Sequence, residues 1–130
     1  MEFSIKLEDY SEETRAGIIK ETKNRKLLNY AVKSAASSDR AAAALNPIIS
    51  EAQIRLLAKD PSDEVKSSVL RNKKMPGNII DMMFDDNNVT TYENLIVNHP
   101  NVLKKTLKRF LKYRTDKNLC LVAQRRLMYM

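Results

Sequence analysis

The sequence predicts an all-α fold, built as a short α-solenoid of about five stacked helix pairs. The chain of 130 residues contains only 2 Gly and 4 Pro, a composition that argues against a turn-rich β-sandwich or barrel. Similar short segments end at Asn46, Asn72 and Asn98, which are spaced 26 residues apart. Between these segments, apolar residues recur at helical spacing, so each repeat holds two helices that must stack on their neighbours to bury their apolar sides.

Each unit is expected to contain a short helix, a tight turn and a second helix. A Pro, which suits the first position of a helix, follows each marker Asn at Pro47, Pro76 and Pro100. Asn46 and Asp60 each precede a Pro and are expected to be the N-caps of the helices that follow. Asp9 has capping-box spacing with Glu12 and is expected to begin the first unit.

The repeat spacing predicts a single helical-repeat domain over residues 1–130. An N-terminal arm at 1–9 precedes repeats at roughly 10–36, 37–60, 61–86 and 87–114 and a partial repeat at 115–130. In the arm, Phe3, Ile5 and Leu7 alternate with polar residues, which predicts a short extended segment laid over the first unit or offered to a partner as an edge strand. The apolar residues 127–130 would need a cover, so self-association or partner docking is expected there.

One unit resembles a known family of repeats. Residues 57–66, Leu-Ala-Lys-Asp-Pro-Ser-Asp-Glu-Val-Lys, resemble the leucine-rich-repeat variant (LRV) signature, in which Leu-Ala-x-Asp-Pro is followed after three residues by Val and a basic residue. Residues 83–89 resemble a degraded copy of it. LRV proteins belong with the HEAT-like helical repeats. The resemblance therefore implies a right-handed helical stack with a binding role, and it carries over no catalytic residue.

The composition limits the chemistry that the chain can perform. A single Cys excludes an internal disulfide and a Cys-based metal cluster, and a single His excludes a multi-His metal site. We therefore expect a protein that is not an enzyme and that uses no cofactor. A weaker alternative is a hard-cation site at Asp81, Asp85 and Asp86. No apolar run is long enough to span a bilayer and no secretory signal is evident, so a cytoplasmic protein without a membrane partner is expected.

Basic residues gather toward the C-terminus. The net charge is +7, and residues 101–130 hold nine Lys and Arg against one Asp. On a helix, four of these lysines would share one face while Leu103, Leu107 and Phe110 would line another. The candidate contact residues in this region are Lys104, Lys105, Lys108, Arg109, Lys112 and Arg114. A second, smaller basic patch contains Lys23, Arg25 and Lys26.

The charge of each second helix favours a protein partner. A groove that follows a nucleic-acid backbone requires one sign of charge along its length. The second helices instead carry +4, 0, −3 and +6 over residues 20–33, 48–60, 77–86 and 101–114. The sequence therefore predicts a non-catalytic binding module that recognises an acidic surface on a protein through its basic C-terminal face. The alternative is a sequence-independent nucleic-acid binding protein that uses the same residues to contact phosphates.

Overall fold

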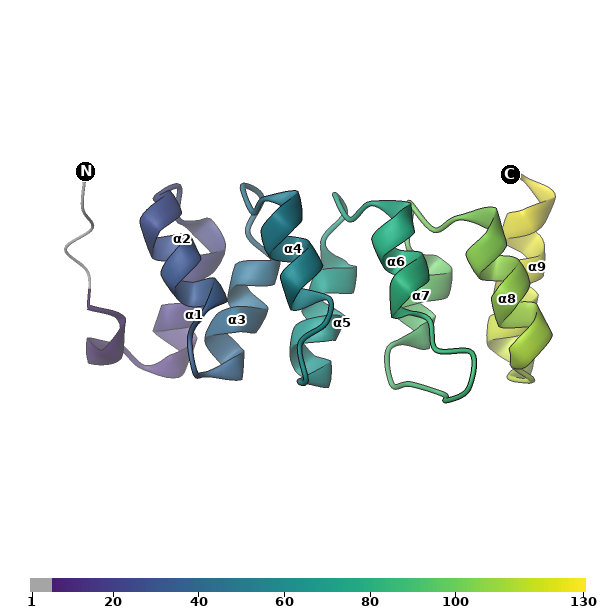
Figure 1. The fold of residues 1–130 in the computed structure, drawn as a ribbon, viewed down its shortest axis with the longest axis horizontal. Helices are drawn as coiled ribbons and strands as arrows, with labels where there is room; N and C mark the ends of the chain where they lie inside the picture. The colour runs from purple at the N-terminus through teal and green to yellow at the C-terminus, as the bar shows by residue number, and fades with distance from the viewer. Residues whose placement is uncertain (1–5) are drawn as a thin grey trace. The chain divides into compact units, whose positions relative to one another are not determined.

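The computed structural model describes residues 6–130 and confirms the all-α class (Figure 1). These residues form α-helices and one short 3-10 helix, and no strand occurs among them. The chain divides into two compact units, Met1–Asn72 and Lys73–Met130. The first unit contains the 3-10 helix Leu7–Asp9 and helices α1 (Glu12–Glu21), α2 (Arg25–Val32), α3 (Ser37–Ala44), α4 (Glu51–Leu57) and α5 (Asp63–Arg71). The second contains α6 (Gly77–Met83), α7 (Glu93–Asn98), α8 (Lys104–Tyr113) and α9 (Lys117–Met128).

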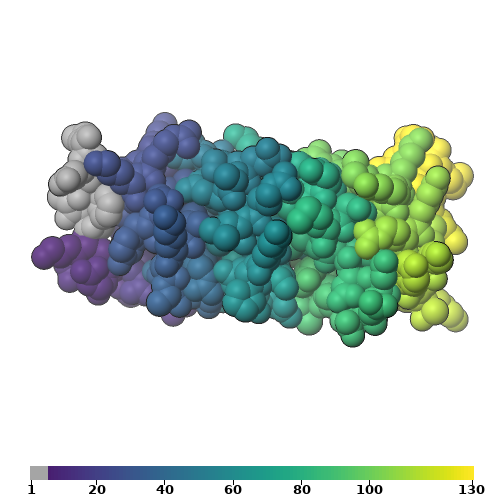
Figure 2. All heavy atoms as spheres, viewed as in Figure 1, coloured from purple at the N-terminus to yellow at the C-terminus, as the bar shows by residue number. Residues whose placement is uncertain are grey.

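The helices of the first unit lie in two layers. Helix α3 packs between α1 and α5, and α2 packs beside α4 (Figure 1). Figure 2 shows the side chains of α2 and α4 meeting on the viewed face. Residues 41–44 of α3 are four consecutive buried alanines, so the neighbouring helices can approach this helix closely. The largest fully buried side chains of the unit are Ile19, Leu27, Leu28, Leu57, Val65 and Val69.

Contacts at both ends of α3 fix its direction relative to α1. Near the N-terminal ends, Arg15 Nε donates a hydrogen bond of 3.2 Å to Asp39 Oδ1. At the C-terminal ends, Asn46 Nδ2 donates to the carbonyl oxygens of Ile19 and Thr22, at 2.7 Å and 2.9 Å. Since equivalent ends lie together, α1 and α3 run in the same direction. The Asn46 amide also satisfies carbonyl groups that the end of α1 leaves without helical partners.

The same arrangement joins α3 to α5. Arg40 Nε donates to Asp60 Oδ2 at 2.7 Å on the N-terminal side, and Asn72 Nδ2 donates to the Ala44 carbonyl oxygen at 2.9 Å on the C-terminal side. Helices α3 and α5 are therefore also parallel. The prediction that Asp60 caps α5 is wrong, because its carboxylate binds Arg40 and the N-cap is Ser62. The Asp60 Oδ1 atom still accepts from the Ser62 backbone N–H, at 2.9 Å.

Two other predicted caps are also corrected. Asn46 does not cap α4, because its amide is bound to the end of α1. Ser50 caps α4 instead, in a capping box with Gln53. Asp9 does not cap α1 either, since it ends the 3-10 helix and Ser11 is the N-cap. In each case a serine two to four residues further along the chain is the N-cap instead.

The second unit also packs alternate helices against one another. Helix α6 packs against α8, and α7 packs against both α8 and α9. Phe84 and Phe110 form an aromatic contact with ring centroids 6.0 Å apart. Gly77 begins α6 where a Cβ atom would lie only 2.6 Å from the Asn101 carbonyl oxygen and 2.7 Å from Leu103 Cδ2. The absence of a side chain at Gly77 therefore lets the segment that leads into α8 approach α6.

The positions of the helices can be compared with the expected repeats. The ranges 10–36, 37–60, 61–86 and 87–114 each contain two helices. The boundary at Asn72 places α5 in one unit and α6 in the other, so their pairing and the single 1–130 domain stay predictions. In the arm, Phe3 and Ile5 lie outside the described residues. Leu7 is buried within a 3-10 helix, so the expected extended segment does not include residues 7–9.

Candidate interaction surface

Helix α8 separates an apolar side from a basic side. Thr106, Leu107 and Phe110 are buried. The opposite side carries four exposed lysines, which we call the α8 lysine face: Lys104, Lys105, Lys108 and Lys112. Figure 2 shows side chains of α8, in light green, at the surface on the viewed face. The 3.6-residue period of the sequence accounts for this separation, because three of the four lysines recur every four residues.

The α8 lysine face is poorly neutralised within the second unit. The Lys105 ammonium lies 3.7 Å from an Asp81 carboxylate oxygen, and 67% of its side chain is exposed, so solvent screens this pair. Lys112 lies over the Tyr113 ring, with its Nζ atom 5.1 Å from the ring centroid. Lys104 and Lys108 make no side-chain hydrogen bond or ion pair within the part of the chain that the structure describes. Two of the four charges are thus free to meet an external anion.

The α8 lysine face also opposes the electrostatics of its own helix. The N-terminus of a helix carries a partial positive charge, which favours acidic residues in the first turn. Helices α1 and α5 follow this rule, with acidic pairs at 12–13 and 63–64. Helix α8 begins with Lys104 and Lys105, has no acid in its first turn and has no side-chain cap at Leu103. Lysines four residues apart also repel one another along the face.

Arg109 serves the packing of the second unit. Its guanidinium donates to Asp81 Oδ1 and to Asp86 Oδ1, each at 2.8 Å, and it lies 5.0 Å from the centroid of the Phe84 ring. Burial disfavours the charged form of Asp81. Hydrogen bonds from Thr106 and Arg109 outweigh that effect and hold the pKa of Asp81 below its ordinary value. The Arg109 guanidinium is therefore occupied by groups of its own unit.

Arg114 is buried, and its guanidinium is held on several sides. Its Nη2 atom donates to Glu93 Oε2 at 2.7 Å, and each of the two side chains is only 5% exposed. The same nitrogen contacts the backbone carbonyls of Asp85 and Asn88, and the guanidinium lies 4.6 Å from the centroid of the Phe84 ring. The hydrogen bonds to Glu93 raise the pKa of Arg114 still further. Arg114 therefore fixes the loop between α6 and α7 and exposes almost none of its side chain to solvent.

The acidic residues of α6 and of the segment after it are engaged within the unit. Asp81 and Asp86 bind Arg109. Asp85 Oδ1 accepts from the backbone N–H groups of Asn87 and Asn88, which lowers the pKa of Asp85. Within residues 6–130, no group of three or more His, Cys, Asp or Glu side chains is arranged to hold a metal ion. Their local role is to neutralise arginine and to shape the loop.

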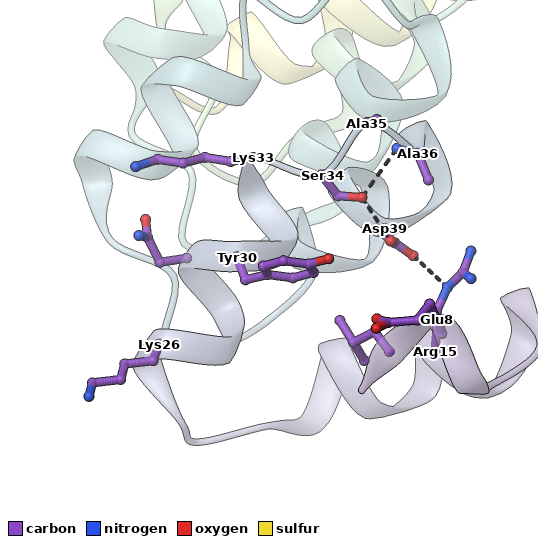
Figure 3. A pocket seen from close by; sticks show the side chains of 11 residues that line it. Glu8, Arg15, Lys26, Tyr30, Lys33, Ser34, Ala35, Ala36 and Asp39 are labelled. Carbon is purple, nitrogen blue, oxygen red and sulfur yellow. Dashed lines mark hydrogen bonds and ion pairs between the residues drawn. The ribbon is translucent and has the colours of Figure 1, made fainter. Parts of the chain in front are cut away.

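The smaller basic patch lies in the first unit, at the start of α2. Lys23, Arg25 and Lys26 are exposed, and Arg25 Nη1 donates to the Ile48 carbonyl oxygen at 3.3 Å. Lys26 lines an open depression of about 700 Å³ between α2, the 3-10 helix and the start of α3. Figure 3 shows the Lys26 side chain extending away from the ion pair of Asp39 with Arg15. The depression therefore offers no converging set of free cations.

Two residues that sequence reasoning missed hold the second unit together, one from the turn before α8 and one from α9. Asn101 Nδ2 donates to the carbonyl oxygens of Lys73 and Met75, at 2.8 Å and 2.9 Å. Arg126 Nη1 donates to the carbonyl oxygens of Val97 and His99, each at 2.7 Å. The repeat period had singled out Asn98, but Asn98 Nδ2 bonds only within its own helix, to the Asn94 carbonyl oxygen. An Asn beside a Pro is the sequence feature that could have identified the bridging asparagines, since Asn101 follows Pro100 and Asn46 precedes Pro47.

Comparisons with known proteins add no assignment. No protein-family model, curated protein or solved structure matches this chain. The likeness of residues 57–66 to the LRV signature therefore stays a prediction. Within residues 6–130, no helix combines the length and the apolar character needed to cross a bilayer.

Proposed function

We propose that this protein is a non-catalytic binding module that recognises an acidic protein surface through the α8 lysine face. The observation that carries the proposal is the placement of lysines against the dipole of α8, with Lys104 and Lys108 unpaired among the described residues. Local rules of helix stability are usually broken where a residue serves another purpose. An acidic partner would remove both the repulsion between lysines and the unfavourable charge at the start of the helix.

We also propose that the chain is a helical-repeat solenoid of the HEAT-like or LRV type. The support comes from side chains that reach back to carbonyl groups at the end of an earlier helix. Asn46, Asn72 and Arg126 each do so, over 24 to 29 residues of sequence. A bond that recurs at about one repeat length is what a tandem array of helix pairs requires. In such an array the α8 lysine face would lie on a second helix, open for docking.

The first test reverses charge on the α8 lysine face. A variant with Lys104→Glu, Lys105→Glu and Lys108→Glu should retain its far-ultraviolet circular dichroism and lose partners captured from the native source. A matched variant with Lys23→Glu, Lys26→Glu and Lys33→Glu reverses three exposed lysines of the first unit instead. Equal capture by the wild type and the α8 variant would reject the proposal. Loss of capture in the first-unit variant alone would transfer the function to the smaller patch.

A second test separates the protein partner from nucleic acid. Lysines that recur every four residues can also contact phosphates, and such contacts weaken steeply as salt rises. Fluorescence anisotropy should compare an arbitrary DNA duplex with a Glu-rich peptide at about 50 mM and 200 mM salt. We expect the peptide to bind and the duplex to bind weakly. Tight duplex binding with a steep salt dependence, together with nuclease-sensitive capture, would favour the nucleic-acid alternative.

A further inference from the structure

An open depression lies next to the α8 lysine face in the second unit. It has a volume of about 460 Å³, and it is formed by the loop between α6 and α7, the start of α7 and the turn between α8 and α9. The loop and the turn lie at the lower edge of the view in Figure 1. Pockets that bind small groups measure roughly 300–1,000 Å³, so the depression can hold a side chain of a partner. We call it the Tyr113 pocket.

The Tyr113 pocket exposes apolar side chains that the second unit does not cover. Val89 is 76% exposed and Tyr113 is 42% exposed. The half-buried side chain of Leu119, on α9, completes the apolar lining. The uncharged remainder of the lining consists of threonine and asparagine side chains. An apolar side chain that entered the pocket would remove apolar surface of all three residues from water, which is favourable.

The charged groups of the pocket favour an uncharged occupant. Glu93 and Arg114 lie in the lining, where each side chain is 5% exposed and the two neutralise each other at 2.7 Å. Asp116 is exposed, and its carboxylate accepts a hydrogen bond of 2.9 Å from the Leu119 backbone N–H at the start of α9. A carboxylate that entered the pocket would meet the negative charge of Asp116, whereas an apolar side chain would not.

The Tyr113 ring joins the pocket to the α8 lysine face. The Lys112 Nζ atom lies 5.1 Å from the centroid of this ring, and Tyr113 also lines the pocket. Lys108 and Lys104 precede Lys112 at intervals of four residues, so their Cα atoms are spaced by about 6 Å along α8. The second unit therefore presents a row of cations that ends at an apolar pocket.

An occupant of this surface must combine a row of carboxylates with an apolar side chain at one end. On a helix, glutamates four residues apart lie on one face, at the same spacing of about 6 Å as the lysines. A helix that runs antiparallel to α8 places its positive N-terminal end beside the negative C-terminal end of α8, which is favourable. The pocket lies at that end of α8, so the apolar residue must precede the glutamates in the sequence of the partner.

We infer that the α8 lysine face and the Tyr113 pocket form one docking site for an acidic helix with an apolar residue at its N-terminal end. The inference rests on the proposed function and specifies the partner. Glutamates one turn apart bind the lysines of α8, and the apolar side chain enters the pocket. The charges speed association and set the orientation, while the buried apolar residue adds affinity. A nucleic-acid backbone carries the charge but has no apolar side chain to place against Val89 and Tyr113.

Two synthetic peptides test the inference on the full chain by fluorescence anisotropy. Both carry three glutamates one helical turn apart in an alanine-rich background. One of them has phenylalanine one turn before the first glutamate, where the other has alanine. We expect the phenylalanine peptide to bind at least about tenfold more tightly, because burial of a phenylalanine side chain contributes at least about this factor. Equal binding of the two peptides would overturn the inference and leave the proposed function standing.

Removal of the apolar lining provides the complementary measurement. Val89→Ser with Tyr113→Ser should weaken binding of the phenylalanine peptide to the level of the alanine peptide, whose own affinity should hardly change. Val89→Ser alone, at the more exposed position, should give a smaller loss in the same direction. Leu121→Ser with Met128→Ser is the matched control, because it removes two exposed apolar side chains of α9. A preference for phenylalanine that survived in the pocket variants, or was lost in the control, would contradict the inference.

Charge reversal separates the inference from the proposed function. Lys104→Glu, Lys105→Glu and Lys108→Glu together should abolish binding of both peptides, because the glutamates would then meet like charges. If both peptides still bound this variant, or if neither bound the wild type, the proposed function and the inference would fail together. If both peptides required the lysines but bound equally well, only the inference would fail.

Discussion

The first unit packs its helices on the buried alanines of α3, whereas the second unit encloses an aromatic ring between two arginines. Around α3, buried methyl groups allow close packing, and the amides of Asn46 and Asn72 reach the preceding helix ends directly. In the second unit, Arg109 and Arg114 extend to the segment that follows α6 and enclose the Phe84 ring. The longer loop between α6 and α7 is held by two arginines, because its backbone carbonyls are reached only by long side chains with several donors.

This contrast indicates that the second unit depends most on a single side chain. Arg114→Ala should lower the free energy of unfolding by about 3–5 kcal/mol, because it leaves the Glu93 carboxylate buried and unpaired. Urea denaturation would measure the change, and hydrogen exchange should become faster in residues 85–92. Arg125→Ala, at an exposed position on α9, should change stability by less than about 0.5 kcal/mol. Equal effects of the two substitutions would refute the special role of Arg114.

The corresponding test in the first unit concerns Asn46. Asn46→Ala should cost about 1–3 kcal/mol, because the buried carbonyl oxygens of Ile19 and Thr22 would lose their donor. Asn98→Ala should cost less than about 0.5 kcal/mol, since Asn98 is exposed and bonds only within α7. Thermal unfolding of both variants gives the comparison. If the two substitutions lowered stability equally, the repeat period in the sequence would predict the stabilising asparagines better than the hydrogen bonds in the structure do.

The two glycines should respond to alanine with opposite signs. Gly77→Ala should destabilise the second unit by about 1–3 kcal/mol, because the new methyl would clash with the Asn101 carbonyl oxygen. Gly17→Ala should stabilise the first unit by about 0.5–1 kcal/mol, because alanine favours the helix and the added Cβ meets nothing. Urea midpoints of the two variants against the wild type would decide. A shared sign would mean that the close approach at Gly77 is relaxed in solution.

The smallest expected effect concerns the start of α8. Lys104→Glu should raise the stability of the second unit by about 0.3–1 kcal/mol, because an acid suits the positive end of the helix. The same variant should bind an acidic partner more weakly. Lys112→Glu, at the other end of α8, should give no such gain, because an acid there opposes the dipole. A loss of stability in Lys104→Glu, measured by urea denaturation, would mean that the lysine supports the fold and does not serve a partner.

Much of the secondary structure could be predicted from the sequence, because helical periodicity is a local signal. The helix pairs fall within the expected ranges, and the lysines of α8 lie opposite Leu107 and Phe110. The caps were less predictable. An Asn or Asp before a Pro is a good cap in isolation, yet Asn46 and Asp60 are used by α1 and by Arg40. Tertiary contacts thus compete for the residues that local rules assign to helix ends.

The candidate site was likewise predictable only in its local features. Composition located the basic region, and periodicity placed its lysines on one side of α8. Periodicity could not show that Arg109 and Arg114 form ion pairs within the protein while the lysines are exposed. The acidic partners of those arginines are 21 to 28 residues away in the sequence.

The alanines of α3 have a further consequence for the spacing of the first unit. Ala43 and Ala44 are fully buried, so a single methyl group sets how near the flanking helix axes can come. A valine or leucine at either position would act as a wedge and force the adjoining turns apart. The distance between these helices is therefore sensitive to a single added carbon atom at Ala43. A series of increasingly large side chains at this position should bend the first unit by increasing amounts.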